Sequence, residues 1–275
     1  MGADTAARSL QHWSEAHRAG MDAFYALATE DYRQLAAARD WPADLRARAR
    51  DGRVRLLDVA CGSGKFPSAL LRAGLAQRAG DLVVDTDLLD PSAFSLAETR
   101  GVLAPPFRAA AEHRVPLERF DPAHGPYDVA WATHALYAVA PADLADGVAR
   151  MVAALRPGGL GVVAQATSRS HYLAFYEAYR AALAPSATPY TTAEDVAGAL
   201  RGAGAAVEVA VLRYRTGSAD RAVVEGFLQR CAFDDTVPLD RMADTGPLGR
   251  YLEGCRDGAG WVFEHEVHLL TWEAA

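Results

Sequence analysis

The sequence predicts an α/β fold in which helices cover both faces of a mostly parallel sheet. Between residues 54 and 166, short apolar segments alternate with segments of helical periodicity, which is typical of parallel strands joined by crossover helices. A glycine turn at residues 61–64 separates the first apolar segment from the first of these helices. The chain has 275 residues, of which 51% are hydrophobic and 23% charged, so it can bury a large core.

Helical periodicity precedes the sheet and alternates with strands along the rest of the chain. Apolar and aromatic residues recur every three or four positions over 9–50, so we interpret residues 1–50 as a helical N-terminal cap. Residues 51–275 would form the main domain, with a helical insertion at 168–190 after the fifth strand. Strands are expected at 54–60, 82–90, 106–110, 128–133, 160–166, 207–214 and 261–272. Helices are expected at 66–78, 93–103, 141–155, 172–183, 192–203, 219–231 and 238–256.

Composition narrows the classes of partner and the cellular compartment. The formal net charge is −7 and no basic run is present, which disfavours binding to nucleic acid. No apolar run is long enough to span a membrane and no secretory signal is visible, so we expect a cytoplasmic protein without a membrane partner. Cys61, Cys231 and Cys255 form no C-x-x-C pair, which fits a reducing compartment. No cluster has metal-ligand spacing, so no metal is predicted, and His12 and His17 are expected at the surface.

The segment from Leu56 to Gly64 carries the strongest functional signal. A hydrophobic strand runs into Gly-Ser-Gly and then a helix, which lets the backbone turn tightly and approach a ligand closely. A dinucleotide motif would need a third glycine where Pro67 stands, and the Gly-Lys-Ser/Thr ending of a P-loop is absent. Asp58 lies just before the glycines, which suits a cationic, phosphate-free ligand. A Rossmann domain for another nucleotide, or a fold that has lost its cofactor, is the alternative.

This segment resembles motif I of the class I S-adenosylmethionine-dependent methyltransferases, and three later segments extend the resemblance. They are Asp90-Pro91-Ser92 after the second strand, Tyr127-Asp128-Val129-Ala130-Trp131-Ala132 at the fourth, and Leu155-Arg156-Pro157-Gly158-Gly159 before the fifth. The resemblance implies a Rossmann-like class I methyltransferase fold, with a seven-stranded, mostly parallel sheet whose last strand is antiparallel. It also implies S-adenosyl-L-methionine as the cofactor of the domain that follows the cap.

The resemblance further implies which residues hold the cofactor. The family places an acid at the end of the second strand that accepts hydrogen bonds from the ribose hydroxyls, which points to Asp90, with Asp85 and Asp87 as competitors. Glu112 is the candidate for the adenine amino group, and a surface role is its alternative. The candidate cofactor-binding residues are Asp58, Ala60, Cys61, Gly62, Gly64, Asp90, Pro91, Glu112 and Thr133.

Within that superfamily, the second half of the chain is most similar to the histamine N-methyltransferase group. The likeness rests on Asp90-Pro91-Ser92, Thr133-His134-Ala135-Leu136-Tyr137, Pro189-Tyr190-Thr191-Thr192-Ala193-Glu194-Asp195, Gly226-Phe227-Leu228, Cys231-Ala232-Phe233 and the last strand from Phe263 to Glu273. Thr29-Glu30 lies near the N-terminal Thr-Glu that carries a substrate-binding carboxylate in that group. The likeness does not imply histamine as the substrate.

Two histidines are the candidate catalytic residues. Methyl transfer from a sulfonium is an in-line displacement, so the protein mainly orients the nucleophile and excludes water. By resemblance, His134 and His265 face the substrate, and His134 would act there as a base or a hydrogen-bond partner. Packing at the cleft edge is the alternative for His134. An exposed position on an edge strand is the alternative for His265.

The candidate substrate-binding residues are Glu30, Tyr25, Tyr137 and His171. Glu30 would pair with a cationic amine, and a solvated surface position is its alternative. Tyr25 would shield the sulfonium by cation–π contact, or else pack the cap onto the main domain. Tyr137 would close over the methyl donor or belong to the core, and His171 follows the fifth strand at the same edge of the sheet.

We therefore expect an S-adenosylmethionine-dependent methyltransferase that acts on a small molecule, with secondary metabolism as one setting. N-methylation is preferred over O-methylation because of the candidate carboxylate and the histamine-group likeness. One alternative is an enzyme that uses the same cofactor for cyclisation or aminocarboxypropyl transfer. Another is a non-catalytic binding partner that keeps the fold, and the intact Gly62, Gly64 and Asp90 count against it. The sequence predicts neither the substrate nor the oligomeric state.

Overall fold

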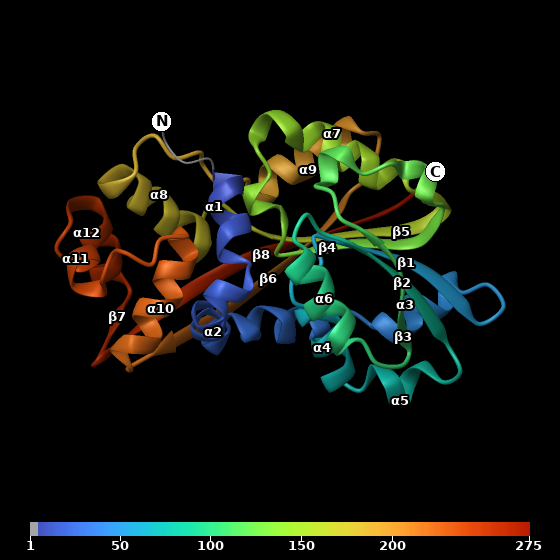
Figure 1. The fold of residues 1–275 in the computed structure, drawn as a ribbon, viewed down its shortest axis with the longest axis horizontal. Helices are drawn as coiled ribbons and strands as arrows, with labels where there is room; N and C mark the ends of the chain where they lie inside the picture. The colour runs from blue at the N-terminus through green and yellow to red at the C-terminus, as the bar shows by residue number, and fades with distance from the viewer. Residues whose placement is uncertain (1–4) are drawn as a thin grey trace.

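One sheet contains all the strands in residues 5–275, the part of the chain that the computed structural model describes (Figure 1). Its order is β3-β2-β1-β4-β5-β8-β6, and the short β7 pairs with β8. The strands are β1 (Arg53–Val59), β2 (Val83–Leu89), β3 (Phe107–His113), β4 (Tyr127–Thr133), β5 (Leu155–Ala166), β6 (Glu208–Ser218), β7 (Arg256–Asp257) and β8 (Gly260–Glu273). Strands β1 to β5 pair in parallel, whereas β8 is antiparallel to both β5 and β6. The predicted mostly parallel sheet with an antiparallel last strand is confirmed, and that strand lies inside the sheet.

Helices connect the strands and cover the sheet. The α-helices are α1 (Thr5–His12), α2 (Arg18–Ala37), α3 (Trp41–Arg48), α4 (Lys65–Arg72), α5 (Leu75–Ala79), α6 (Ala93–Val102), α7 (Pro141–Ala153), α8 (His171–Leu183), α9 (Ala193–Gly202), α10 (Arg221–Ala232), α11 (Leu239–Ala243) and α12 (Gly246–Gly254). Short 3₁₀ helices are η1 (Glu15–His17), η2 (Leu117–Arg119), η3 (Pro122–His124) and η4 (Leu136–Ala138).

Some expected helices are divided in the structure. The segment 66–78 forms α4 and α5, because Gly74 adopts a left-handed φ of +86° between them. The segment 238–256 is likewise divided into α11 and α12. The helical segment 9–50 is divided into α1, η1, α2 and α3, and α1 begins at Thr5.

Some expected strands are longer in the structure. The fifth strand begins at Leu155 rather than at Leu160, because Leu155 already pairs with Tyr127 before the register shifts. β6 continues beyond Tyr214 to Ser218, because β8 pairs with it along this whole length. β3 likewise continues to His113 beside β2.

Successive residues of the central strands point to opposite faces of the sheet. Leu56 of β1 belongs to a buried cluster with Trp41 of α3 and Phe66 of α4. Leu57, its neighbour, belongs to a second buried cluster with Val148 of α7. The parallel strands are therefore buried on both faces, and ligands can approach them only at their ends.

Helices α8, α10, α11 and α12 gather at one end of the molecule around the long strands β6 and β8 (Figure 1). Their shared core is rich in aromatic side chains, including Phe175, Phe227 and Phe263. Helix α10 also packs against α2, so the C-terminal part of the chain contacts the N-terminal helices. Among the helices of residues 5–275, none is both long enough and apolar enough to cross a lipid bilayer.

Truncation of Leu56 tests the packing of the first cluster. This side chain is 0% exposed, so we expect Leu56→Ala to lower the free energy of unfolding by about 2–5 kcal/mol through lost burial and a residual cavity. Val211→Ala on β6 is the control, because Val211 is 42% exposed and its truncation should change stability by about 0.5 kcal/mol or less. Urea denaturation followed by circular dichroism measures both. Equal losses would contradict this assignment of the core.

Candidate functional site

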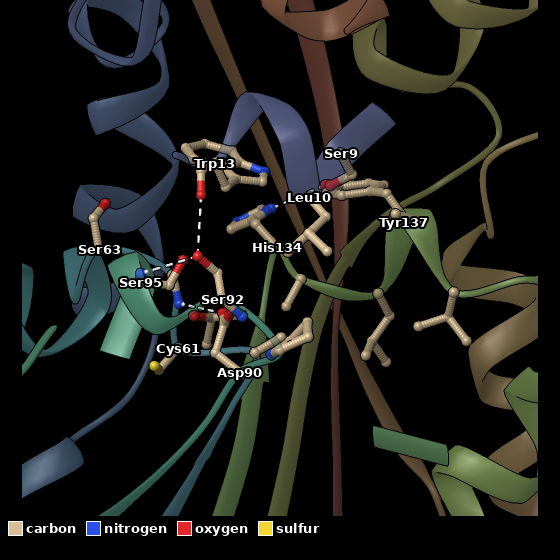
Figure 2. Close-up of a pocket in the computed structure, with 18 of the residues that line it drawn as sticks. Ser9, Leu10, Trp13, Cys61, Ser63, Asp90, Ser92, Ser95, His134 and Tyr137 are labelled. Atoms are coloured by element: carbon tan, nitrogen blue, oxygen red, sulfur yellow. Dashed lines mark hydrogen bonds between the residues drawn. The ribbon is translucent and has the colours of Figure 1, made fainter. Parts of the chain in front are cut away.

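A cavity of about 340 Å³ lies at the carboxyl ends of β1, β2 and β4. This is where open α/β sheets bind ligands, and the volume falls within the range of small-molecule sites. Figure 2 shows Ser9 and Leu10 of α1, together with Trp13, along one side of the cavity, with Asp90 opposite them. The chain N-terminal to the sheet therefore closes the site.

The glycine turn forms one wall of this cavity. Ala60 and Gly62 line it with φ values of +49° and +56°, and the Thr99 hydroxyl of α6 fixes the turn by donating to the Gly62 carbonyl over 2.8 Å. Gly64 has a different role, because a Cβ atom there would lie 2.5 Å from Val102 Cγ2. Gly64 thus permits α4 to approach α6 and lies behind the lining.

Positive φ values outside glycine mark the cavity. The residues with this conformation in the described chain are Asp51, Ala60, His134 and Phe233, and all except Asp51 line the cavity. Left-handed backbone in a residue with a Cβ costs free energy and collects at functional sites. The backbone strain therefore points to the same place as the glycine turn.

Asp58 and Asp90 present two buried carboxylates beside the glycine turn. Asp90 accepts the backbone N–H of Gly62 over 3.1 Å and that of Ser92 over 2.8 Å. Asp58 is 3% exposed, and its Oδ2 atom has no hydrogen-bond partner among the described residues. Burial raises the pKa of Asp58 to about 7, and the charge of Asp90 adds to the rise. A buried carboxylate with a free oxygen favours a cationic or hydrogen-donating ligand.

His134 faces the cavity from the loop after β4. Its Nδ1 lies 3.2 Å from the hydroxyl of Tyr137, and its ring packs edge-on against Tyr32 at 5.5 Å between centroids. Burial lowers the pKa of His134 to about 4, so its imidazole is neutral at pH 7 and is a weak base. Its geometry suits a hydrogen-bond partner for a ligand.

Asp31 of α2 also lines the cavity, although no sequence motif pointed to it as a site residue. Its two oxygens accept hydrogen bonds from the hydroxyls of Tyr172, at 2.6 Å, and Tyr214, at 2.8 Å. It is 3% exposed, and burial raises its pKa to about 7. The cavity thus contains a third carboxylate, held by two tyrosines.

The helical phase of α2 could have identified Asp31. Met21, Ala28 and Leu35 are buried at intervals of seven, and Asp31 lies three residues after Ala28 and four before Leu35. Asp31 therefore belongs to the buried stripe of the helix. Glu30 lies off this stripe, where it accepts hydrogen bonds from Arg33 and Gln34.

His171 and His265 both pack against the ring of Tyr172, an aromatic residue of the cavity lining. His265 is 2% exposed, contacts the Thr216 hydroxyl through Nε2 at 2.8 Å, and stacks on Tyr214. It lies on a strand inside the sheet, so the alternative of an exposed edge position is wrong. His171 is 1% exposed, and its Nδ1 lies 2.9 Å from the Tyr251 hydroxyl. Neither imidazole lines the cavity.

The predicted site residues fall into two groups. Those that line the cavity are Tyr25, Asp58, Ala60, Cys61, Gly62, Asp90, Pro91, Thr133, His134 and Tyr137. Those outside its lining are Glu30, Gly64, Glu112, His171 and His265. Glu112 is exposed on β3, and its carboxylate pairs with Arg100 of α6. The lining also includes residues that were not predicted from the sequence, among them Asp31, Tyr32, Lys65 and Arg230.

Comparisons with known proteins connect this chain to one family. Residues 28–209, the larger part of the chain, match the family described as methyltransferase domain, whereas no curated protein matches the sequence. The structure is similar to BH2331 of Bacillus halodurans C-125, assigned as a methyltransferase, with 14% identity and a TM-score of 0.57 over 86% of this chain and 98% of that one. It is also similar to magnesium protoporphyrin IX methyltransferase of Synechocystis PCC 6803, solved with S-adenosylhomocysteine, with 12% identity and a TM-score of 0.53 over 96% and 99%. YcgJ of Bacillus subtilis gives 12% identity and a TM-score of 0.52 over 82% and 94%.

The raised pKa of Asp31 predicts a pH-dependent stability. Between pH 3.8, its ordinary pKa, and about pH 7, the folded chain keeps a proton on Asp31 that the unfolded chain releases. The free energy of unfolding of wild type therefore falls as the pH rises over this range. Asparagine does not titrate. We therefore expect the difference in free energy of unfolding between Asp31→Asn and wild type to shift in favour of the variant as the pH rises, by up to about 1.4 kcal/mol per pH unit over this range. Asp22→Asn, at an exposed position of the same helix, should follow wild type. Urea denaturation at several pH values measures this, and parallel curves for Asp31→Asn would contradict it.

Proposed function

The chain belongs to the methyltransferase-domain family, and on that premise we propose that it transfers a methyl group to a nitrogen atom of a small cationic amine. S-adenosylmethionine is its cofactor. The observation that carries the proposal is the carboxylate of Asp31, which faces an aromatic cavity and is held by two tyrosine hydroxyls.

The residues beside the glycine turn fit S-adenosylmethionine. The unpartnered, buried Oδ2 of Asp58 suits a ligand that carries positive charge, as this cofactor does. Asp90 lies at the end of β2, where a carboxylate can accept hydrogen bonds from ribose hydroxyls. We assign Asp58, Asp90 and the backbone of Ala60 and Gly62 to cofactor binding. When bound, the cofactor supplies an electrophilic methyl group on a sulfonium sulfur.

Lys65 adds a positive charge to the cavity lining next to the glycine turn. It is the sole lysine of the chain, and its ammonium lies 4.1 Å from the centre of the Tyr25 ring. Burial lowers the pKa of Lys65, and a carboxylate ligand beside the ammonium would offset the free-energy cost of burying this charge. We assign Lys65 to the carboxylate of the methionine part of the cofactor.

Aromatic rings and Asp31 together favour a cationic substrate. Tyr25, Tyr32, Tyr137 and Tyr172 line the cavity and offer ring faces that attract an ammonium group. Asp31 adds a carboxylate that can pair with the same group. This combination supports nitrogen over oxygen as the methyl acceptor, in agreement with the likeness to the histamine N-methyltransferase group.

Proton removal gives Asp31 a second role. An ammonium nitrogen must lose a proton before its lone pair can attack the methyl carbon. Burial brings the pKa of Asp31 to about 7, near the value at which a general base is most effective at neutral pH. The pKa of His134, about 4, makes it a poorer base, so we assign His134 and Tyr137 to orienting the substrate. The aromatic wall excludes water from the reacting atoms.

Substitution of Asp90 tests the cofactor assignment. We expect Asp90→Asn to weaken binding of both S-adenosylmethionine and S-adenosylhomocysteine by about tenfold to 100-fold, because hydrogen bonds to a charged acceptor are lost. Calorimetric titration measures both affinities, and circular dichroism checks folding. Asp85→Asn is the control, because Asp85 pairs with Arg53 and Arg108 outside the cavity. Unchanged affinity in a folded Asp90→Asn variant would overturn the placement of the cofactor.

A pair of adjacent substitutions tests the substrate assignment. With a panel of small amines and matched alcohols, we expect amines to yield S-adenosylhomocysteine. Asp31→Asn should then lower kcat/KM for the best amine by about tenfold to 100-fold, because a charge-assisted pair is lost. Glu30→Gln should change it by less than about threefold, because Glu30 lies outside the cavity lining.

The same assay distinguishes other outcomes. Methylation of the alcohols alone, or a larger effect of Glu30→Gln than of Asp31→Asn, would contradict an amine held by Asp31. Conversion of the cofactor to methylthioadenosine in the absence of any substrate would contradict methyl transfer itself.

A further inference from the structure

Three side chains with metal-binding atoms lie together outside the cavity. His12 ends α1, His17 ends η1, and Asp235 follows α10. One ligand atom from each lies within 4.8 Å of the other two. His12 Nε2 is 3.6 Å from Asp235 Oδ2, and the two imidazole centroids are 5.0 Å apart. His12 is 7% exposed, so its expected surface position is wrong.

The hydrogen bonds of the two histidines leave the same nitrogen free on each ring. His12 Nδ1 lies 2.9 Å from the carbonyl oxygen of Arg8, so it must carry the proton and donate. The Ser14 hydroxyl donates to the Gln11 carbonyl over 2.6 Å, so it accepts from Nδ1 of His17 over 3.1 Å. Both Nε2 atoms therefore keep a lone pair for a metal, and a carbonyl or hydroxyl orients each ring.

Arg230 of α10 positions the backbone of both histidines. Arg230 is 1% exposed, and its guanidinium donates to the carbonyl of His12 and, over 2.9 Å, to the carbonyl of His17. Phe233 packs against the His12 ring at 5.7 Å between centroids. Residues of α10 and the chain after it thus hold both histidines in place. This lowers the conformational entropy that is lost when both imidazoles bind one ion.

The donor set selects the kind of ion. Two imidazole nitrogens and one carboxylate oxygen match zinc sites that keep one open position, and imidazole disfavours magnesium and calcium. The Asp235 side chain is 43% exposed, so an ion can enter from solvent.

We propose that His12, His17 and Asp235 bind one Zn²⁺ ion, which links the α1–η1 segment to the chain after α10. Ser9 and Leu10 of α1 line the cofactor cavity, so the ion restrains the segment that closes this cavity. The site does not depend on the identity of the methyl acceptor, and metal binding can be measured without turnover.

Zinc titration of the untagged full chain tests the site. By calorimetry, wild type should bind one Zn²⁺ per chain, and His17→Gln and Asp235→Asn should each weaken that binding by at least about tenfold. These two positions carry the test because His12 is buried and its substitution also removes packing. His124→Gln is the matched control, an exposed histidine whose ring is paired with that of His113, and it should bind as wild type does.

Thermal unfolding provides an independent readout. Zn²⁺ should raise the Tm of wild type and of His124→Gln, and raise it less in His17→Gln and Asp235→Asn, because a ligand that binds the folded state more tightly stabilises it more. Absence of zinc binding by wild type would overturn the proposal. So would binding that survives both substitutions, or binding that is lost in His124→Gln.

Discussion

Asp58, Asp90 and Asp31 are buried around one cavity, and the arrangement of the site follows from the cost of removing these carboxylates from water. Burial raises the pKa of each. Asp90 is compensated by two backbone N–H groups and Asp31 by two tyrosine hydroxyls, whereas Asp58 keeps an unpartnered oxygen. A positively charged ligand stabilises all three, which fits both the cofactor and the proposed substrate.

The parallel sheet decides where two of these carboxylates can lie. Val59 at the end of β1 is paired with Leu89 at the end of β2, and the N–H of Cys61 bonds to the Leu89 carbonyl over 3.2 Å. The glycine turn and Asp90 therefore leave the sheet side by side. Their proximity depends on the register between β1 and β2. Burial of the strands on both faces fixes this register, because a shift by one residue would move every side chain to the opposite face.

The third carboxylate depends on contacts between distant parts of the chain. Tyr172 follows Asp31 by 141 residues and Tyr214 by 183 residues, yet both donate to it. Arg230 similarly connects α10 to the backbone of His12 and His17. The part of the cavity around Asp31 is thus assembled from the N-terminal helices, α8 and α10, and Tyr214 of β6 supports it without lining the cavity.

The sequence predicted the alternating strands and helices, the glycine turn with Asp58 just before it, and Asp90 at the end of the second strand. These features depend on local periodicity and on residues close in the chain. Helical periodicity also places Asp31 and Glu30 on different faces of α2. Which of these faces is buried is known only from the structure. Tertiary structure alone placed His265 beside Tyr214, Glu112 outside the cavity lining, and Asp235 beside His12. These positions result from packing between elements separated by tens to hundreds of residues, which local patterns do not encode.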